Sequence, residues 1–300
     1  METQYKNLDY VLEGLISRYK ERVPDVDKIV NGLLKEGILN NESAFHNDHI
    51  AFRTMGVPNL GIASMEKIFL HYGYEKKEYL YFEEKKLNAF WYHPPKPEYP
   101  RIFISELRVA DLSTATQEII LKYTNEVTAD PVESLDLNDP KAVDHFLHKA
   151  LWTLPTLADY TTLLKENEYA AWTIYNRYYL NHFTISVHEL AKCNDLESFN
   201  SWLEKNGIQL NDAGGKIKKS PDGLLWQSST VAQMIEATFS NNEKMLISGS
   251  YVEFAERKVL PEFRHLPKEA IRREHRRDGF EAKNADKIFE STFTSQTTKK

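Results

Sequence analysis

Apolar residues recur at helical spacing along the first 35 residues of the sequence. One stripe precedes Pro24 and a second follows it: Leu8, Val11, Leu12, Leu15 and Ile16, then Val26, Ile29, Val30, Leu33 and Leu34. Steps of three and four residues place each set on one face of a helix. We therefore predict two helices in a first segment, residues 1–40.

The pattern changes in residues 41–110, where short apolar runs alternate with polar turns. Strands are expected at Ile50–Thr54, Tyr79–Phe82, Ala89–Tyr92 and Ile102–Leu107, and a helix at Ser64–Tyr72. The order is βαβββ.

The same order returns in residues 179–257. It predicts a helix at Leu196–Asn206 and strands at His182–Val187, Leu224–Ser228, Val231–Phe239 and Met245–Phe254. An alternative takes Lys216–Lys219 as the second strand and Leu224–Phe239 as a hairpin. Residues 111–178 are interpreted as a helical insertion, with helices near Thr114–Tyr123, Ala142–Trp152 and Tyr160–Leu164.

An internal repeat connects the two units. Asn47-Asp48-His49-Ile50 and Leu180-Asn181-His182-Phe183 put one histidine at the same place in each first strand. The expected fold class is therefore α+β, with two βαβββ modules forming a curled mixed sheet.

The last segment, residues 258–300, has a different composition. Lys268–Arg277 reads KEAIRREHRR, which predicts a basic helix with a solvated face. Residues 291–300 are polar and of low complexity, and a flexible tail is expected there.

Charge and composition exclude several classes of protein. Thirty-eight Lys and Arg against 44 Asp and Glu give a net charge of −6, which argues against general nucleic-acid binding. No apolar run is long enough for a membrane span, and the acidic start does not resemble a secretory signal. We expect a cytoplasmic protein without a membrane partner.

The candidate chemistry has to come from histidines and carboxylates. Cys193 is the single cysteine, which excludes a Cys-rich metal site. HExxH, GxSxG, GxxxxGKS/T and GxGxxG are all absent, and with them the zinc protease, hydrolase, P-loop and dinucleotide signatures.

Placement in the repeat favours His49, His182 and Glu253. The first strands of two curled modules can direct both histidines to one interior point, and Glu253 lies in the otherwise apolar run Tyr251–Ala255. A buried carboxylate needs a partner. Two imidazoles and one carboxylate form the facial triad of non-haem Fe(II) oxygenases.

Other side chains compete for these roles. His46 is an alternative to His49, and His188 to His182, although neither has the repeat-equivalent position. Glu106 is the first module's counterpart of Glu253, either as a fourth ligand or as an acceptor that orients a histidine.

Two further residues are candidates for substrate binding. Arg53 lies four residues after His49, so both side chains face the same side of a strand, and its guanidinium suits an anion. A surface ion pair is the alternative for Arg53. Gln227, in the polar run Gln227–Thr230, is a candidate for substrate contact or for satisfying a hairpin.

The motifs NDHIAFRT, PRIFISEL, NHFTISVHEL, LLWQSSTVA and GSYVEFAER, from about residue 40 to 257, resemble the 2-oxoadipate dioxygenase/decarboxylase family of bacterial lysine catabolism. That family is related to the vicinal oxygen chelate fold. The resemblance implies Fe(II) at His49, His182 and Glu253, with Arg53 on the substrate carboxylate and Gln227 as a further contact.

The implied reaction converts 2-oxoadipate and O2 to 2-hydroxyglutarate and CO2. Long members of the family have a further C-terminal segment that contributes to the substrate pocket, so a different 2-oxo acid stays an alternative. Two other readings are an oxygen-independent isomerase or lyase of the glyoxalase type, with Glu106 as fourth ligand, and a non-catalytic module that binds a small acid. The oligomeric state is left open.

Overall fold

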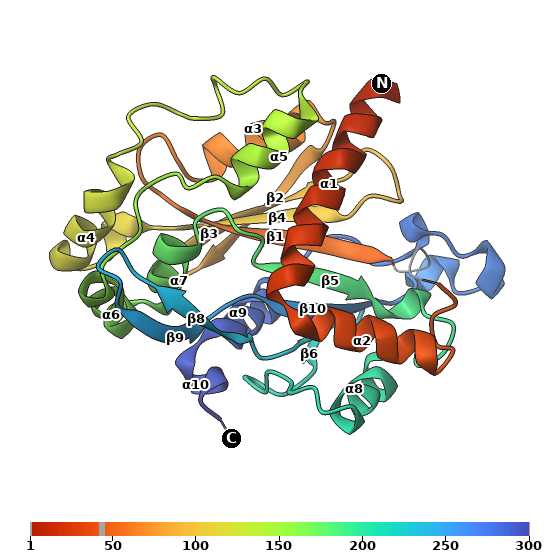
Figure 1. The fold of residues 1–300 in the computed structure, drawn as a ribbon. Coiled ribbons are helices and arrows are strands. Elements are labelled where there is room, and N and C mark those ends of the chain that lie inside the picture. The colour runs from red at the N-terminus through yellow and green to blue at the C-terminus, as the bar shows by residue number, and fades with distance from the viewer. Residues whose placement is uncertain (1, 42–45, 300) are drawn as a thin grey trace.

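An eight-stranded curled sheet organises the computed structural model, which describes residues 2–41 and 46–299 (Figure 1). The strand order is β2-β3-β4-β1-β5-β10-β7-β6. The strands are β1 (Asn47–Met55), β2 (Glu75–Phe82), β3 (Leu87–His93), β4 (Arg101–Leu107), β5 (His182–Ser186), β6 (Lys218–Lys219), β7 (Leu225–Ser229) and β10 (Tyr251–Arg257).

The sheet consists of two equivalent halves that meet at β1 and β5. In each half the first strand is parallel to the last, β1 to β4 and β5 to β10, while β1 and β5 run antiparallel with Ala51 opposite His182. Helix α3 (Ile62–His71) connects β1 to β2, and α8 (Leu196–Lys205) connects β5 to β6. The predicted fold class, two βαβββ modules in one curled mixed sheet, is confirmed.

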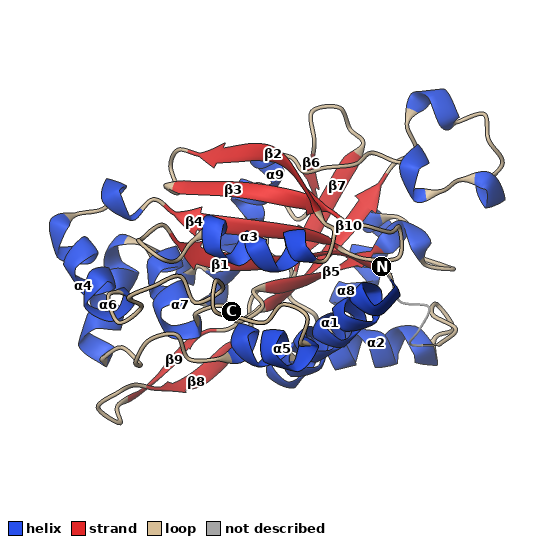
Figure 2. Cartoon of the chain, turned by 90° about the horizontal axis from the view of Figure 1, so that it is seen from above, coloured by secondary structure: helices blue, strands red, loops and turns tan. Residues whose placement is uncertain are grey.

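The second half differs from the prediction in its strands. Lys218–Lys219 is the second strand, as the alternative had it, but Leu224–Phe239 is not a hairpin. Strands β8 (Met234–Thr238) and β9 (Lys244–Ser248) form a separate two-stranded sheet (Figure 2). The expected strand Met245–Phe254 is broken at Gly249, where backbone passes 3.0 Å from the position of a Cβ.

The predicted N-terminal helices are present as α1 (Glu2–Arg22) and α2 (Pro24–Lys35). Pro24 stands in the first turn of α2, where its missing N–H costs nothing. Helix α1 crosses the sheet in Figure 1, and the Tyr19 hydroxyl donates to the carbonyl of Tyr251. The N-terminal segment thereby supports β10 from the side of the sheet that faces the viewer in Figure 1.

The segment between the modules contains four helices: α4 (Thr114–Thr124), α5 (Pro140–His148), α6 (Leu157–Glu166) and α7 (Glu168–Asn176). The first three were predicted. Helix α7 was not, because all but two of its nine residues are buried and no polar face marks it as a helix.

The predicted basic helix at Lys268–Arg277 does not form. Two single-turn 3-10 helices, η5 (Lys268–Ala270) and η6 (Arg273–His275), lie there in an otherwise extended chain. An α-helix would place Arg272 above Arg276 and Arg273 above Arg277, and like charges at that spacing repel. The arginines instead donate to backbone carbonyls.

The predicted flexible tail is also wrong for its described part, residues 291–299. Helix α9 (Ala282–Phe289), η7 (Glu290–Thr292) and α10 (Thr294–Thr297) end the chain, and Ser291, Thr292 and Gln296 are buried. The polar composition suggested a solvated tail, but the polar side chains of this segment form hydrogen bonds within the protein. Ser291 accepts from the side-chain amide of Asn211, and Gln296 accepts from the backbone amide of Asp212.

Helix α9 closes the concave side of the sheet. It contacts β2 at one edge of the sheet and β6 and β7 at the other, so the sheet wraps around it. Over the described ranges, no helix is long and apolar enough to cross a membrane.

Candidate metal centre

His49 lies in the middle of the sheet with its imidazole in the concave interior. It is 1% exposed, and its ring packs edge-on against Phe280 at 4.8 Å between centroids. Its Nδ1 lies 2.8 Å from Oδ1 of Asp48, so the Nδ1 proton is donated to that carboxylate. The Nε2 atom is thereby left to face the interior as an acceptor.

His182 has the same arrangement on the neighbouring strand. It is buried on β5, and its Nδ1 lies 3.0 Å from Oδ1 of Asn181. In both modules, therefore, the residue directly before the histidine accepts its Nδ1 proton. The two Nε2 atoms are 3.4 Å apart.

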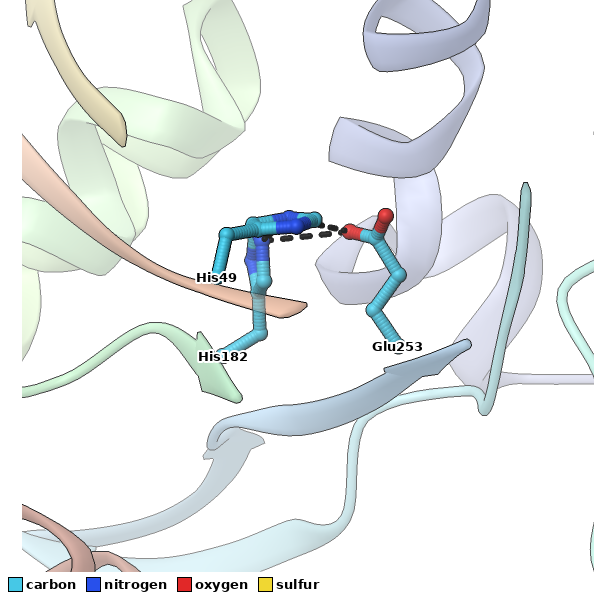
Figure 3. Close-up of side chains that lie close together, drawn as sticks. All are labelled: His49, His182 and Glu253. Atoms are coloured by element: carbon cyan, nitrogen blue, oxygen red, sulfur yellow. Dashed lines mark hydrogen bonds and ion pairs between the residues drawn. The ribbon is translucent and has the colours of Figure 1, made fainter. Parts of the chain in front are cut away.

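Glu253 completes the cluster from β10, which pairs with β5 (Figure 3). Its side chain is 1% exposed. Oε2 of Glu253 lies 3.1 Å from Nε2 of His182 and 3.5 Å from Nε2 of His49. Thr184 adds a hydroxyl 3.0 Å from Nε2 of His49.

The three atoms match the geometry of a facial triad. Ligand atoms at roughly 2.1 Å from a metal ion, on one face of an octahedron, are about 3 Å from each other. Here the separations are 3.1, 3.4 and 3.5 Å, with both imidazole protons directed away. Of the described His, Cys, Asp and Glu residues, only these three form such a group. The residues present therefore fit a divalent metal ion.

The two histidines differ electrostatically. Burial lowers the pKa of His49, but Glu253 and Asp48 outweigh burial, so the pKa is raised above its ordinary value. Burial and the neighbouring charge of His49 hold the pKa of His182 well below its ordinary value. A site that keeps one imidazole neutral and presents a carboxylate beside it favours a cation between them.

Gln227 on β7 fixes the carboxylate of Glu253. Its Nε2 donates to Oε1 of Glu253 at 2.7 Å, and its own Oε1 accepts from Nδ2 of Asn284 on α9 at 3.0 Å. Because Oε1 of Glu253 is bonded to Gln227, Oε2 is the oxygen that faces the histidines. The bond from Asn284 keeps the amide of Gln227 in this orientation. The hairpin alternative for Gln227 does not hold.

Asp48 is itself held by two arginines. Nε and Nη2 of Arg257 donate to its two oxygens at 2.6 and 2.9 Å, and Arg101 adds a contact at 3.3 Å. Burial alone would raise the pKa of Asp48, but these guanidinium groups hold it well below its usual range. Asp48 is therefore an anion that orients His49.

Arg53 lies deeper in the same concave face. Its Nη1 donates to Oγ1 of Thr292 at 3.0 Å and its Nη2 to the carbonyl of Phe289 at 3.2 Å. Its Nε has no hydrogen-bond partner of good geometry among the described residues, and the buried hydroxyl of Tyr251 lies beside the guanidinium. Burial lowers the pKa of Arg53. The surface ion pair considered for Arg53 is thus excluded by its complete burial.

The competing candidates lie elsewhere. His46 is exposed, and His188 accepts from the amide of Arg257 through Nδ1. Glu106 stands opposite Thr54 on the other face of the sheet, where Oε2 accepts from the amide of Ile62 at the start of α3. Glu106 therefore caps a helix and is neither a fourth ligand nor a support for a histidine.

The cavity beside the triad is small. Its volume is about 20 Å³, room for a single water, and its other walls are Phe103, Tyr251, Phe280, Ala285, Ile288 and Phe289. Phe280 and α9 thus cover the three candidate ligands.

Sequence reasoning missed the supporting residues. Asp48 and Asn181 could have been found, because each directly precedes the repeated histidine. Asn284 and Phe280 were missed because they lie between the predicted basic helix at Lys268–Arg277 and the predicted tail at residues 291–300, where no element was expected.

Comparisons with known proteins identify a family for this chain. The family model described as 2-oxoadipate dioxygenase/decarboxylase matches residues 11–272. A relative from Arabidopsis thaliana, named 2-oxoadipate dioxygenase/decarboxylase, chloroplastic, is 44% identical over 84% of this chain and 70% of its own length.

Solved structures are similar as well. A hydroxyglutarate synthase from Oryza sativa, in complex with 2-oxoadipate, superimposes with a TM-score of 0.89 at 40% identity, covering 99% of this chain and 95% of that one. A glyoxalase superfamily protein from Ralstonia eutropha, 20% identical, shares the fold with a TM-score of 0.65 over 83% and 82% of the two chains.

The name of the Arabidopsis relative corrects one expectation. It is described as chloroplastic, which points to a plastid, so the predicted cytoplasmic location is wrong. The prediction rested on the lack of a membrane-length apolar run and of a secretory-signal pattern, neither of which distinguishes one compartment inside the cell from another.

Proposed function

This chain belongs to the 2-oxoadipate dioxygenase/decarboxylase family, and on that basis we propose that it holds Fe(II) at His49, His182 and Glu253. In the proposed reaction, 2-oxoadipate and O2 yield 2-hydroxyglutarate and CO2, as a step of lysine catabolism. Both atoms of O2 enter 2-hydroxyglutarate: one converts the keto carbon into a new carboxylate as the original carboxyl group leaves as CO2, and the other forms the hydroxyl group on the next carbon.

One observation carries the assignment of the metal site. Two Nε2 atoms and one carboxylate oxygen converge within 3.5 Å in a buried interior, while Asp48 and Asn181 take both Nδ1 protons. A cation among these three atoms would balance the buried charge of Glu253. When bound, Fe(II) supplies coordination of a 2-oxo acid and the activation of O2.

Arg53 is the proposed partner of the substrate's distal carboxylate. It is a buried cation whose two printed hydrogen bonds go to a hydroxyl and a carbonyl, and no ion pair of Arg53 with a carboxylate occurs among the described residues. A buried guanidinium with a free Nε can bind a carboxylate in a charge-assisted bond. This supports a dicarboxylate as the substrate class.

Gln227 and Phe280 have different roles in the proposal. Gln227 positions Glu253 through its amide, and Asn284 keeps that amide in one orientation. Phe280 and the apolar side chains of α9 exclude water from the site, which protects a reactive oxidant.

Substrate entry requires a rearrangement. A cavity of about 20 Å³ does not admit a six-carbon dicarboxylate. Since α9 and η7 form the wall on the open side of the sheet, we propose that this segment moves when the substrate binds. The C-terminal residues 282–299 then form the outer wall of the substrate pocket.

The oxygen-independent glyoxalase reading is not favoured. It needs Glu106 as a fourth ligand, but Glu106 lies on the other face of the sheet at the start of α3.

Isotopically labelled O2 provides the test. The protein is loaded with Fe(II) without air and given 2-oxoadipate and labelled O2, and the products are analysed by mass spectrometry. We expect 2-hydroxyglutarate with both labelled atoms and one CO2 for each O2 consumed. Conversion without consumption of O2, or glutarate as the sole product, would refute the proposed reaction.

A further inference from the structure

A second cavity lies on the other side of Asp48 from the metal centre. Its volume is about 330 Å³, and it shares no lining residue with the cavity at His49. The segment Ile271–Arg276 forms one wall, at the right-hand edge of Figure 1. The proposed function gives this cavity no role.

Five arginines line it: Arg101, Arg257, Arg272, Arg273 and Arg276. The acidic lining residues are Asp48, Glu98 and Glu189, so two positive charges are in excess. His188, also in the lining, is neutral at neutral pH because burial lowers its pKa to about 3.

The positive charges are unequally neutralised. Arg257 and Arg101 share Asp48, and Arg101 has a second carboxylate in Asp278 at 2.6 Å. Arg272 donates to the carbonyls of Glu269 and Ile271, and Arg276 to the carbonyl of Arg257. These carbonyls are acceptors but do not carry a compensating charge.

In Arg273, only the Nη1 atom of the side chain forms hydrogen bonds with the described residues. Its Nη1 donates to the carbonyls of Pro97 and Tyr99, both at 2.6 Å. Its Nε and Nη2 are buried and have no hydrogen-bond partner among the described residues. Two buried donors of one guanidinium without a protein acceptor leave that guanidinium able to bind the oxygens of an anion.

Neither of the two glutamates in the lining accepts a hydrogen bond from the unpaired donors of Arg273. Glu98 pairs with Lys96 at 3.7 Å, and Glu189 lies 3.3 Å from His188 and 4.0 Å from Arg276. An anion with two charges would balance the excess, and guanidinium groups bind carboxylate and phosphate oxygens through paired N–H donors.

We propose that this cavity binds a small dianion, with carboxylate, phosphate or sulfate oxygens, through Arg272, Arg273 and Arg276. Asp48, which forms part of the wall, also accepts the Nδ1 proton of His49, so the two cavities stand back to back. The proposal does not depend on the identity of the metal or the reaction.

Isothermal titration of the full-length protein tests it, with sulfate and glutarate as probes and chloride to hold the ionic strength constant. We expect saturable binding at one site. Arg273→Gln should weaken binding at least tenfold. Arg272→Gln should weaken it several-fold, and because Arg272 is exposed this variant should fold normally.

Arg264→Gln is the matched control, since it removes the same charge from an exposed position outside the cavity. Equal binding by all four proteins, or no saturable binding of either probe, would overturn the proposal. So would binding that is lost in Arg53→Gln but kept in Arg273→Gln, because it would place the anion at the metal centre.

The two probes separate the sources of the ligand. Sulfate binding alone would indicate a phosphate-like group, and glutarate binding alone would indicate a dicarboxylate. Either result supports a dianion site if it is sensitive to Arg273→Gln.

Discussion

Asp48 accepts the Nδ1 proton of His49 at 2.8 Å and is held in place by Nε and Nη2 of Arg257. The metal centre is thus built on a buried ion pair that fixes one tautomer of a candidate ligand.

Asp48→Asn should therefore impair both binding and folding. The amide leaves Arg101 and Arg257 without their buried anion, and breaking such a pair costs about 3–5 kcal/mol. Metal affinity should fall roughly 10- to 100-fold because His49 loses its orienting acceptor. Chemical denaturation and anaerobic Fe(II) titration measure the two effects.

Asp111→Asn is the control, because its carboxylate is half-exposed and paired with Arg108; it should change the free energy of unfolding by less than about 1 kcal/mol. Unchanged metal affinity in Asp48→Asn would contradict this role.

Arg53→Met should weaken substrate binding without lowering the stability of the protein. We expect Fe(II) to bind as in the wild type and KM for 2-oxoadipate to rise at least about tenfold, since a charge-assisted hydrogen bond contributes about 1.5–3 kcal/mol. Because Arg53 is a buried cation without a carboxylate partner among the described residues, an apolar side chain of similar length should leave Tm unchanged or raise it. Steady-state kinetics and thermal unfolding measure the two. A large fall in Tm with unchanged KM would show that Arg53 is structural.

His188 predicts a pH dependence of stability. Burial lowers its folded-state pKa to about 3, and the unfolded value is about 6.5. Between these values the unfolded chain binds the extra proton, so stability falls as the pH decreases, by about 1.4 kcal/mol per pH unit for one proton. His188→Gln should lose this contribution. Denaturation at pH 5.5 and 4.5 gives the difference in slope between the two proteins, and equal slopes would refute the prediction.

The C-terminal residues should contribute measurably to stability. Ser291 is buried and hydrogen-bonded to Asn211 and Ser229, so Ser291→Ala should lower the free energy of unfolding by about 1–3 kcal/mol. Thr298→Ala, at an exposed position in the same segment, should stay within about 0.5 kcal/mol of the wild type. Equal stability of both variants would indicate a tail that does not pack.

Periodicity predicted the parts of the fold whose residues have one buried and one exposed face. The stripes of α1 and α2 follow this rule, whereas β1 and β4 are buried on both faces and were predicted as short apolar runs. The repeated histidine brought His49 and His182 to the same point. Glu253 stood out because it is a carboxylate among buried apolar neighbours.

The remainder depended on long-range contacts. Helix α7 is buried on nearly all sides, and β8 and β9 alternate like main-sheet strands although their outer residues Met234 and Leu246 are 40% and 61% exposed. Lys268–Arg277 is extended because its arginines reach distant carbonyls such as that of Tyr99. The order of residues 291–299 comes from a donor on Asn211 and an acceptor on Glu168, which no local pattern reveals.

The most direct test compares Glu253 with Glu106, which lies in the last strand of the first module but on the other face of the sheet. Wild type, Glu253→Gln and Glu106→Gln are reconstituted with Fe(II) without air, and metal content and O2 uptake are measured with and without 2-oxoadipate. We predict that Glu106→Gln retains iron and substrate-dependent uptake, because an amide oxygen can still accept from Ile62, whereas Glu253→Gln loses both. Full iron and uptake in Glu253→Gln, or their loss in Glu106→Gln alone, would contradict the assigned metal centre.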